Sequence, residues 1–147
     1  MNSIQSYLVK FMLRRSNIWN KPLNEVRKTM EGVKANGMPE GIEVSRQTMN
    51  GVSCEVFRHP SGKKGKVILY FHGGGFCLGI FPANREFAAK ICAITETDVY
   101  MPDYRLAPEH PFPAALEDAI AAYRGIIGNG FYGKDVVIMG DSSGCAL

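Results

Sequence analysis

A serine flanked by glycines stands near the end of the 147-residue sequence, in the run GDSSG at 140–144. This G-x-S-x-G pattern is typical of a nucleophile on a sharp turn between a strand and a helix. Such a turn strains the serine backbone, and the two glycines remove side chains that would clash. The pattern occurs by chance, but here it follows directly on the apolar run VVIM at 136–139. We therefore predict a buried strand whose end presents Ser142 as a nucleophile.

A second glycine turn, HGGGF at 72–76, follows the apolar run KVILYF at 66–71. Ligands of open parallel sheets bind beyond the carboxyl ends of the strands, where both turns would lie. Acyl transfer creates an oxyanion that needs backbone N–H donors at close range. We predict an oxyanion hole built from the glycine turn Gly73, Gly74 and Gly75 together with Ser143, in which the donors are the N–H groups of Gly74, Gly75 and Ser143. We expect His72 to support this turn through hydrogen bonds.

Several other reactive side chains have less distinctive surroundings. We expect His59 and His110 to be surface or structural residues. Asp141 directly precedes the nucleophile, so its carboxylate should point elsewhere and cannot orient a base. Cys145 would lie in the first turn after Ser142, where a thiolate could be stabilised, but inert packing is the expected role.

The pattern around these turns predicts the elements that position them. Residues 1–40 are expected to be helical, with one apolar stripe over 4–12 and another formed by Leu23, Val26, Met30 and Val33. Pro22 would start the second helix, and Asn36-Gly37 would close it. Packing against a neighbouring layer explains both stripes, and a helix on a membrane surface stays as the alternative because Lys10, Arg14 and Arg15 could face anionic headgroups.

From residue 42 the period changes to that of strands. IEVSRQT and VSCEVFR alternate around Asn50-Gly51, which predicts a hairpin. The continuous run at 66–71 is typical of a strand buried on both faces. A helix is expected next from about Pro82, with Phe87, Ile91 and Ile94 on one face, and it is followed by a strand in DVYMPDYRL. Pro111 and Pro113 then introduce a second helix, which carries Leu116, Ile120, Tyr123 and Ile127. The last expected element is a strand in DVVIMG. This order predicts an α/β fold with a mostly parallel sheet.

Three blocks together resemble the hormone-sensitive-lipase-like carboxylesterases and lipases of the α/β-hydrolase superfamily: HGGGF at 72–76, DYRLAPEHPFPAALEDA at 103–119 and GDSSG at 140–144. The resemblance runs from about residue 45 onward. It implies hydrolysis of short- to medium-chain acyl esters by a Ser-Asp-His triad, without metal or cofactor. It also implies a helical cap segment at 1–40, in which Tyr7, Phe11 and Met12 either line the acyl pocket or pack in the core. Residues 41–147 would then form the N-terminal half of the hydrolase core.

The resemblance treats the middle block as scaffold. Asp103, Arg105 and Glu109 could suggest a catalytic acid, but in such enzymes the block is an ion-paired turn that supports the glycine loop.

In this fold the triad runs in the order Ser, Asp or Glu, then His. The residues after Ser142 include neither an acid nor a histidine. We therefore expect a chain that is truncated after the nucleophile elbow and inactive alone, because a serine without a base is a poor nucleophile. The alternative is a non-catalytic fragment, or a subunit that needs a second chain supplying Asp and His. The last strand would also expose an apolar edge.

Composition and charge exclude several other classes of function. The net charge is +3 with scattered Lys and Arg, so nucleic-acid binding is not expected. No apolar run reaches the length of a membrane span, the N-terminus does not resemble a secretion signal, and the four cysteines predict free thiols and a cytoplasmic protein. Zinc is not expected, since no histidine pairs with a cysteine at ligand spacing. Gly73, Gly75 and Gly79 loosely match a dinucleotide turn, but the next helix would start too late for one.

Overall fold

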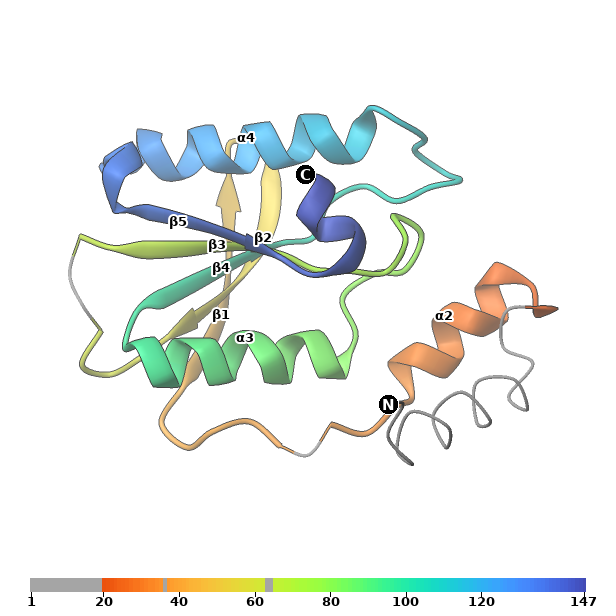
Figure 1. Cartoon of the computed structure of the whole chain (residues 1–147), viewed down its shortest axis with the longest axis horizontal. Helices are drawn as coiled ribbons and strands as arrows, with labels where there is room; N and C mark the ends of the chain where they lie inside the picture. The colour runs from red at the N-terminus through yellow and green to blue at the C-terminus, as the bar shows by residue number, and fades with distance from the viewer. Residues whose placement is uncertain (1–19, 36, 63–64) are drawn as a thin grey trace, which may run out of the picture.

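The computed structural model describes residues 20–35, 37–62 and 65–147 and shows a five-stranded sheet with flanking helices (Figure 1). The strands are β1 (Glu43–Met49), β2 (Val52–Arg58), β3 (Val67–Phe71), β4 (Asp98–Pro102) and β5 (Val136–Gly140). Their order in the sheet is β1-β2-β4-β3-β5. β2 is antiparallel to both β1 and β4, whereas β4, β3 and β5 pair in parallel. The predicted mostly parallel α/β sheet is confirmed.

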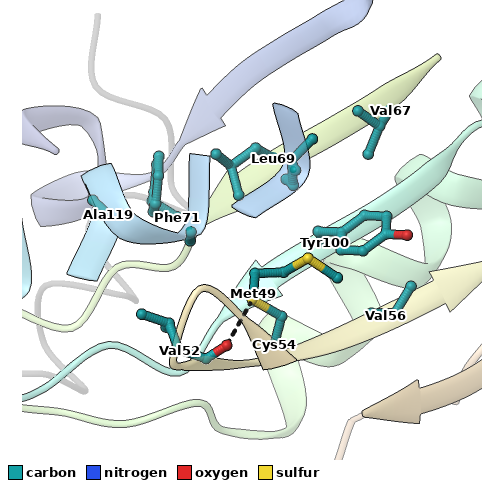
Figure 2. Packing of buried hydrophobic residues seen from close by; sticks show 11 residues of the cluster. Met49, Val52, Cys54, Val56, Val67, Leu69, Phe71, Tyr100 and Ala119 are labelled. Carbon is teal, nitrogen blue, oxygen red and sulfur yellow. Dashed lines mark hydrogen bonds between the residues drawn. The ribbon is translucent and has the colours of Figure 1, made fainter. Parts of the chain in front are cut away.

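Helices cover the two faces of this sheet. Figure 1 shows α3 (Pro82–Thr95) on one side and α4 (Ala114–Gly128) on the other. Each helix packs on its own cluster of buried side chains. The α4 cluster includes Leu69, Phe71 and Tyr100, several of which Figure 2 shows, and the α3 cluster includes Ile68, Tyr70 and Met101. Alternate residues of the central strands therefore enter opposite clusters, as the pleat of a strand requires.

The hairpin forms at the predicted turn. Met49 pairs with Val52, which leaves Asn50 and Gly51 as a two-residue connection. Both have positive φ, 46° and 87°, as a type I′ turn needs. Helix α4 packs tightly on this turn, since a side chain at Gly125 would meet the Met49 backbone at 2.7 Å. The hairpin is thereby fixed to the face that α4 covers.

The faces of the two long helices that pack on the sheet differ from the apolar faces that the sequence predicted. Helix α3 begins at Pro82 as expected, but Ala88, Ala89 and Cys92 face the sheet. Phe87 is 45% exposed and Ile94 is 83% exposed. In α4 the buried hydrophobic residues are Ala114, Ala119, Ala122 and Ile126, and of the predicted side chains Tyr123 packs against their cluster, whereas Ile120 is 43% exposed. Small residues face the sheet because they let a helix approach it closely.

The N-terminal prediction is confirmed only in part. Helix α2 (Leu23–Glu31) exists and buries Val26. It ends at Glu31, before the predicted Asn36-Gly37 stop, so Val33 lies outside it and is 42% exposed. The predicted helix over 4–12, including Tyr7, Phe11 and Met12, lies outside the described residues. Within the described residues, no helix combines the length and apolar character needed to cross a membrane.

Strand β5 forms where predicted but is not buried. It pairs with β3 from Val136 to Gly140. Val137 and Ile138 are 55% and 59% exposed. Among the residues that the structure describes, no strand pairs with the other edge of β5, which agrees with the expected exposed apolar edge. The prediction of burial was wrong because only one side of this strand has a neighbour here.

Candidate active site

The turn after β5 holds Ser142 in a strained conformation. Its φ is 49°, in the left-handed region that side chains other than glycine rarely adopt. A side chain at Gly140 would meet the Gly144 backbone at 2.5 Å, and one at Gly144 would meet the Phe71 carbonyl carbon at 2.7 Å. Neither position therefore has room for a side chain. The chain continues as a 3-10 turn, η3 (Ser142–Ala146).

The two glycine turns meet at one edge of the sheet. β3 and β5 are parallel neighbours, and Phe71 is in register with Gly140, so their carboxyl ends lie side by side. The Asp141 N–H donates to the Phe71 carbonyl at 3.3 Å. Gly74 has a φ of 132°, and a side chain there would meet Leu78 Cβ at 2.8 Å. The sequence-predicted residues 72–75 and 142–143 are thus brought together.

The Asp141 carboxylate ties these turns to each other. Its Oδ1 accepts hydrogen bonds from the Tyr70 hydroxyl at 2.6 Å and from the Gly73 N–H at 2.8 Å. Burial, followed by this hydrogen bond, raises the pKa of Tyr70, so the phenol stays protonated and keeps donating. The Gly73 N–H is therefore committed to Asp141, and the N–H groups of Gly74, Gly75 and Ser143 stay the predicted donors to an oxyanion.

His72 lies beneath the glycine turn and is fully buried. Its Nδ1 is 2.8 Å from the Gly73 carbonyl oxygen, which can only accept, so Nδ1 carries the proton. The ring stacks on Tyr104 at 4.3 Å, and the Tyr104 hydroxyl donates to the His72 carbonyl at 2.6 Å. Burial lowers the pKa of His72, which favours the neutral ring. This placement agrees with the expected support of the turn by His72, and the supporting role itself stays a prediction.

The middle block contacts the glycine turn and forms ion pairs. The Ala107 N–H donates to the Phe76 carbonyl at 2.8 Å. Arg105 pairs with Asp118 at 2.8 Å and with Glu117 at 3.1 Å. The predicted ion-paired turn next to the glycine loop is therefore present in the structure.

Arg27 of α2 connects the N-terminal helix to this region, a contact that the sequence patterns did not indicate. Its guanidinium donates to the carbonyls of Cys77 at 2.8 Å and Ala107 at 3.0 Å. It also binds both carboxylate oxygens of Glu109, at 2.6 and 2.8 Å. One side chain thus holds α2 against both loops.

A pocket of about 380 Å³ lies between α2 and the glycine turn. Its lining includes Lys21, Leu23 and Val26 from the N-terminal region and Ser142 from the turn after β5. The rest of the lining is Gly74, Gly75, Cys77 and Leu78. Ser142 and two of the predicted oxyanion donors, Gly74 and Gly75, thus line one cavity together with α2.

Of the remaining candidates, the two histidines lie apart from this arrangement, whereas Cys145 lies in the turn that begins at Ser142. His59 Nδ1 contacts the Ser61 hydroxyl at 2.9 Å on the surface, and His110 is exposed. The Cys145 thiol donates to the Gly140 carbonyl at 3.0 Å. Within the described ranges, no group of three His, Cys, Asp or Glu side chains could hold a metal ion.

The Arg27–Glu109 pair predicts an acid-dependent contribution to stability. The Arg27 hydrogen bond lowers the pKa of Glu109 from 4.5 to about 2. Because the folded pKa lies below the unfolded one, the stabilisation is complete above pH 4.5 and is lost as the pH falls through about 2. We expect Glu109→Gln to be less stable than the wild type at pH 6, with the difference shrinking between pH 4.5 and 2.

Urea unfolding of both proteins across this pH range measures the difference. Glu96→Gln is the control, because Glu96 caps the C-terminal end of α3, outside the region that Arg27 contacts. A Glu109→Gln difference that stays constant from pH 6 to pH 2 would contradict the prediction.

Comparison with known proteins finds the α/β-hydrolase family and relatives that are named as ester hydrolases. A family model described as alpha/beta hydrolase fold matches residues 68–147. An acetyl-hydrolase of Streptomyces hygroscopicus is 37% identical over 111 residues, which are 76% of this chain and 36% of that protein. The crystal structure of EstE5 soaked with p-nitrophenyl butyrate superimposes with a TM-score of 0.78 at 43% identity, over 84% of this chain and 42% of that one.

A structure of an esterase from the bacterial hormone-sensitive lipase family has a TM-score of 0.76 at 35% identity, with the same coverage of 84% and 42%. The chain therefore spans less than half the length of each of these three proteins.

Proposed function

The chain belongs to the α/β-hydrolase family, with hormone-sensitive-lipase-like esterases as its structural neighbours, and on this premise we propose that it provides the nucleophile and the oxyanion hole of a serine carboxylesterase. The observation that carries the proposal is the strained Ser142, which shares a pocket with Gly74 and Gly75. The proposed substrates are esters with short- to medium-chain acyl groups. The pocket of about 380 Å³ and the butyrate ester soaked into the EstE5 crystals support this size.

The proposed reaction has two stages. The Ser142 hydroxyl gives its proton to a base, and its oxygen attacks the carbonyl carbon of the ester. The carbonyl π electrons move to oxygen, and the resulting oxyanion accepts hydrogen bonds from the N–H groups of Gly74, Gly75 and Ser143. When the oxyanion collapses, the alcohol leaves with a proton from the base, and water then releases the acid from Ser142 by the same steps.

The base and the acid that orients it are proposed to come from beyond the 147 residues. Each histidine described here has another environment: His59 contacts Ser61, His72 is buried under the glycine turn, and His110 is exposed. An Asp and a His would be supplied by further sequence or by a second chain, which we infer as a partner.

We also propose that residues 1–40 act as the cap segment and 41–147 as part of the hydrolase core. Helix α2 contributes a wall of the pocket and is held in place by Arg27. Its side chains would then contact the acyl or alcohol group of a bound ester.

The test combines turnover with covalent labelling. Hydrolysis of p-nitrophenyl butyrate is measured with this chain alone and with a polypeptide that supplies the acid and histidine. A fluorophosphonate probe is applied in parallel, and the labelled peptide is identified by mass spectrometry. We expect an adduct on Ser142 and turnover in the complemented form. If neither form shows turnover nor a Ser142 adduct, the chain is a non-catalytic binding fragment.

A further inference from the structure

The Ser143 hydroxyl occupies one of the proposed oxyanion donors. The Gly75 N–H donates to Ser143 Oγ at 2.9 Å. Gly75 lies in the glycine turn with a φ of 63°, and Ser143 directly follows the nucleophile. The oxygen of a side chain thus lies where a substrate oxygen would have to be received.

The Ser143 side chain also interacts with a buried tyrosine. Burial raises the pKa of Tyr104 to about 12, and the interaction with Ser143 acts in the opposite direction. The Tyr104 hydroxyl itself donates to the His72 carbonyl at 2.6 Å. The hydroxyl that meets the Gly75 N–H thus lies beside the side chain that supports the glycine turn.

We propose that Ser143 is a positioning residue whose hydroxyl fills the oxyanion hole while no substrate is bound and is displaced from the Gly75 N–H when an ester enters. The proposal rests on the ester hydrolase function proposed above. It gives the two neighbouring serines different tasks: Ser142 reacts, and Ser143 keeps a donor satisfied and aligned until the reaction starts.

Displacement has a measurable consequence. An incoming oxyanion must replace a hydrogen bond that already exists, so part of the gain is offset by the loss of the Ser143 contact. A neutral hydrogen bond of ordinary net strength corresponds to roughly 2- to 10-fold in a binding constant. Removal of the Ser143 oxygen should therefore strengthen the binding of an oxyanion mimic by roughly this factor.

The test uses two variants that both keep the backbone N–H of residue 143. Ser143→Ala removes the hydroxyl, and Ser143→Thr retains an oxygen at the same position. Exchange of the Gly75 amide, followed by NMR, reports the resting contact without any catalysis. Butylboronic acid, which forms an anionic tetrahedral adduct on a serine oxygen, is added to each protein complemented with the polypeptide that supplies the acid and histidine, and it reports the donor strength of the hole.

We expect the Gly75 amide to exchange faster in Ser143→Ala and butylboronic acid to bind it roughly 2- to 10-fold more tightly, with Ser143→Thr resembling the wild type in both measurements. An unchanged Gly75 amide in Ser143→Ala overturns the proposal, as does equal or weaker boronate binding by that variant. If butylboronic acid binds none of the three proteins, both this proposal and the oxyanion-hole assignment are wrong. If it binds all three equally, only the proposal about Ser143 is wrong.

Discussion

Replacing Ser142 with alanine is expected to lower ester turnover of the complemented protein by a factor of about 10⁴ or more, because the acyl-enzyme cannot form without the nucleophilic oxygen. The oxyanion donors and the pocket remain in the variant, so binding of an ester should be largely retained. Covalent labelling by a fluorophosphonate probe should disappear entirely. The measurement is p-nitrophenyl butyrate hydrolysis together with probe incorporation.

Ser61→Ala provides a matched control. Ser61 also forms a serine–histidine hydrogen bond, with His59 at 2.9 Å, but this pair is exposed and belongs to a surface turn. The control should keep full turnover and labelling. If Ser142→Ala retains labelling, or if Ser61→Ala loses it, the nucleophile lies elsewhere.

The largest expected effect on stability comes from Gly144→Ala. A side chain there would lie 2.7 Å from the Phe71 carbonyl carbon and 2.8 Å from the His72 carbonyl oxygen. Both neighbours are backbone atoms at the end of β3, which cannot rotate away as a side chain could. We expect a loss of about 3 kcal/mol in the free energy of unfolding, at the upper end of the cost of overpacking. Urea unfolding followed by circular dichroism measures it.

Gly128→Ala is the control for this change. Gly128 is the last residue of α4, and no neighbouring atom lies within 4 Å of the position that a new side chain would take. Because alanine favours a helix more than glycine does, this variant should be as stable as the wild type or up to about 1 kcal/mol more stable. Equal midpoints for Gly144→Ala and the wild type would show that the turn after β5 has more room than the structure gives it.

Local patterns predicted much of the fold. The two-residue turn at Asn50 and Gly51 requires positive φ, and an Asn-Gly pair predicts such a turn because both residue types tolerate this conformation. Strand β3 lies between two strands and between two helices. All five of its residues are buried, as its continuous apolar run predicts. In both cases the cause of the structure lies within a few residues of sequence.

Patterns failed where the cause lies in a distant segment. The apolar stripe of α3 pointed to Phe87 and Ile94, yet the helix approaches the sheet through Ala88 and Ala89, and the size of the gap depends on side chains of the sheet. The burial of β5 was overestimated because a strand sequence does not reveal whether both its edges are paired.

The contacts of the candidate site were the least predictable part. Asp141 binds Tyr70 and Gly73, roughly seventy residues earlier, and no spacing rule joins them. The sequence motifs locate the two turns. The side-chain contacts that hold the turns together depend on the pairing of β3 with β5, which the motifs do not specify. Arg27 is a similar case, since an arginine on a short helix is usually a solvated residue.

The contacts by which Arg27 holds α2 determine how far the sequence of the N-terminal segment can change while its position is kept. Two of its acceptors, the oxygens of Cys77 and Ala107, belong to the peptide backbone and survive any substitution at those positions. Only Glu109 must be retained as a matching charge. N-terminal segments grafted from related enzymes should therefore be interchangeable whenever they deliver one guanidinium to this spot, and chimeras of this kind could exchange ester selectivity without rebuilding the catalytic turns.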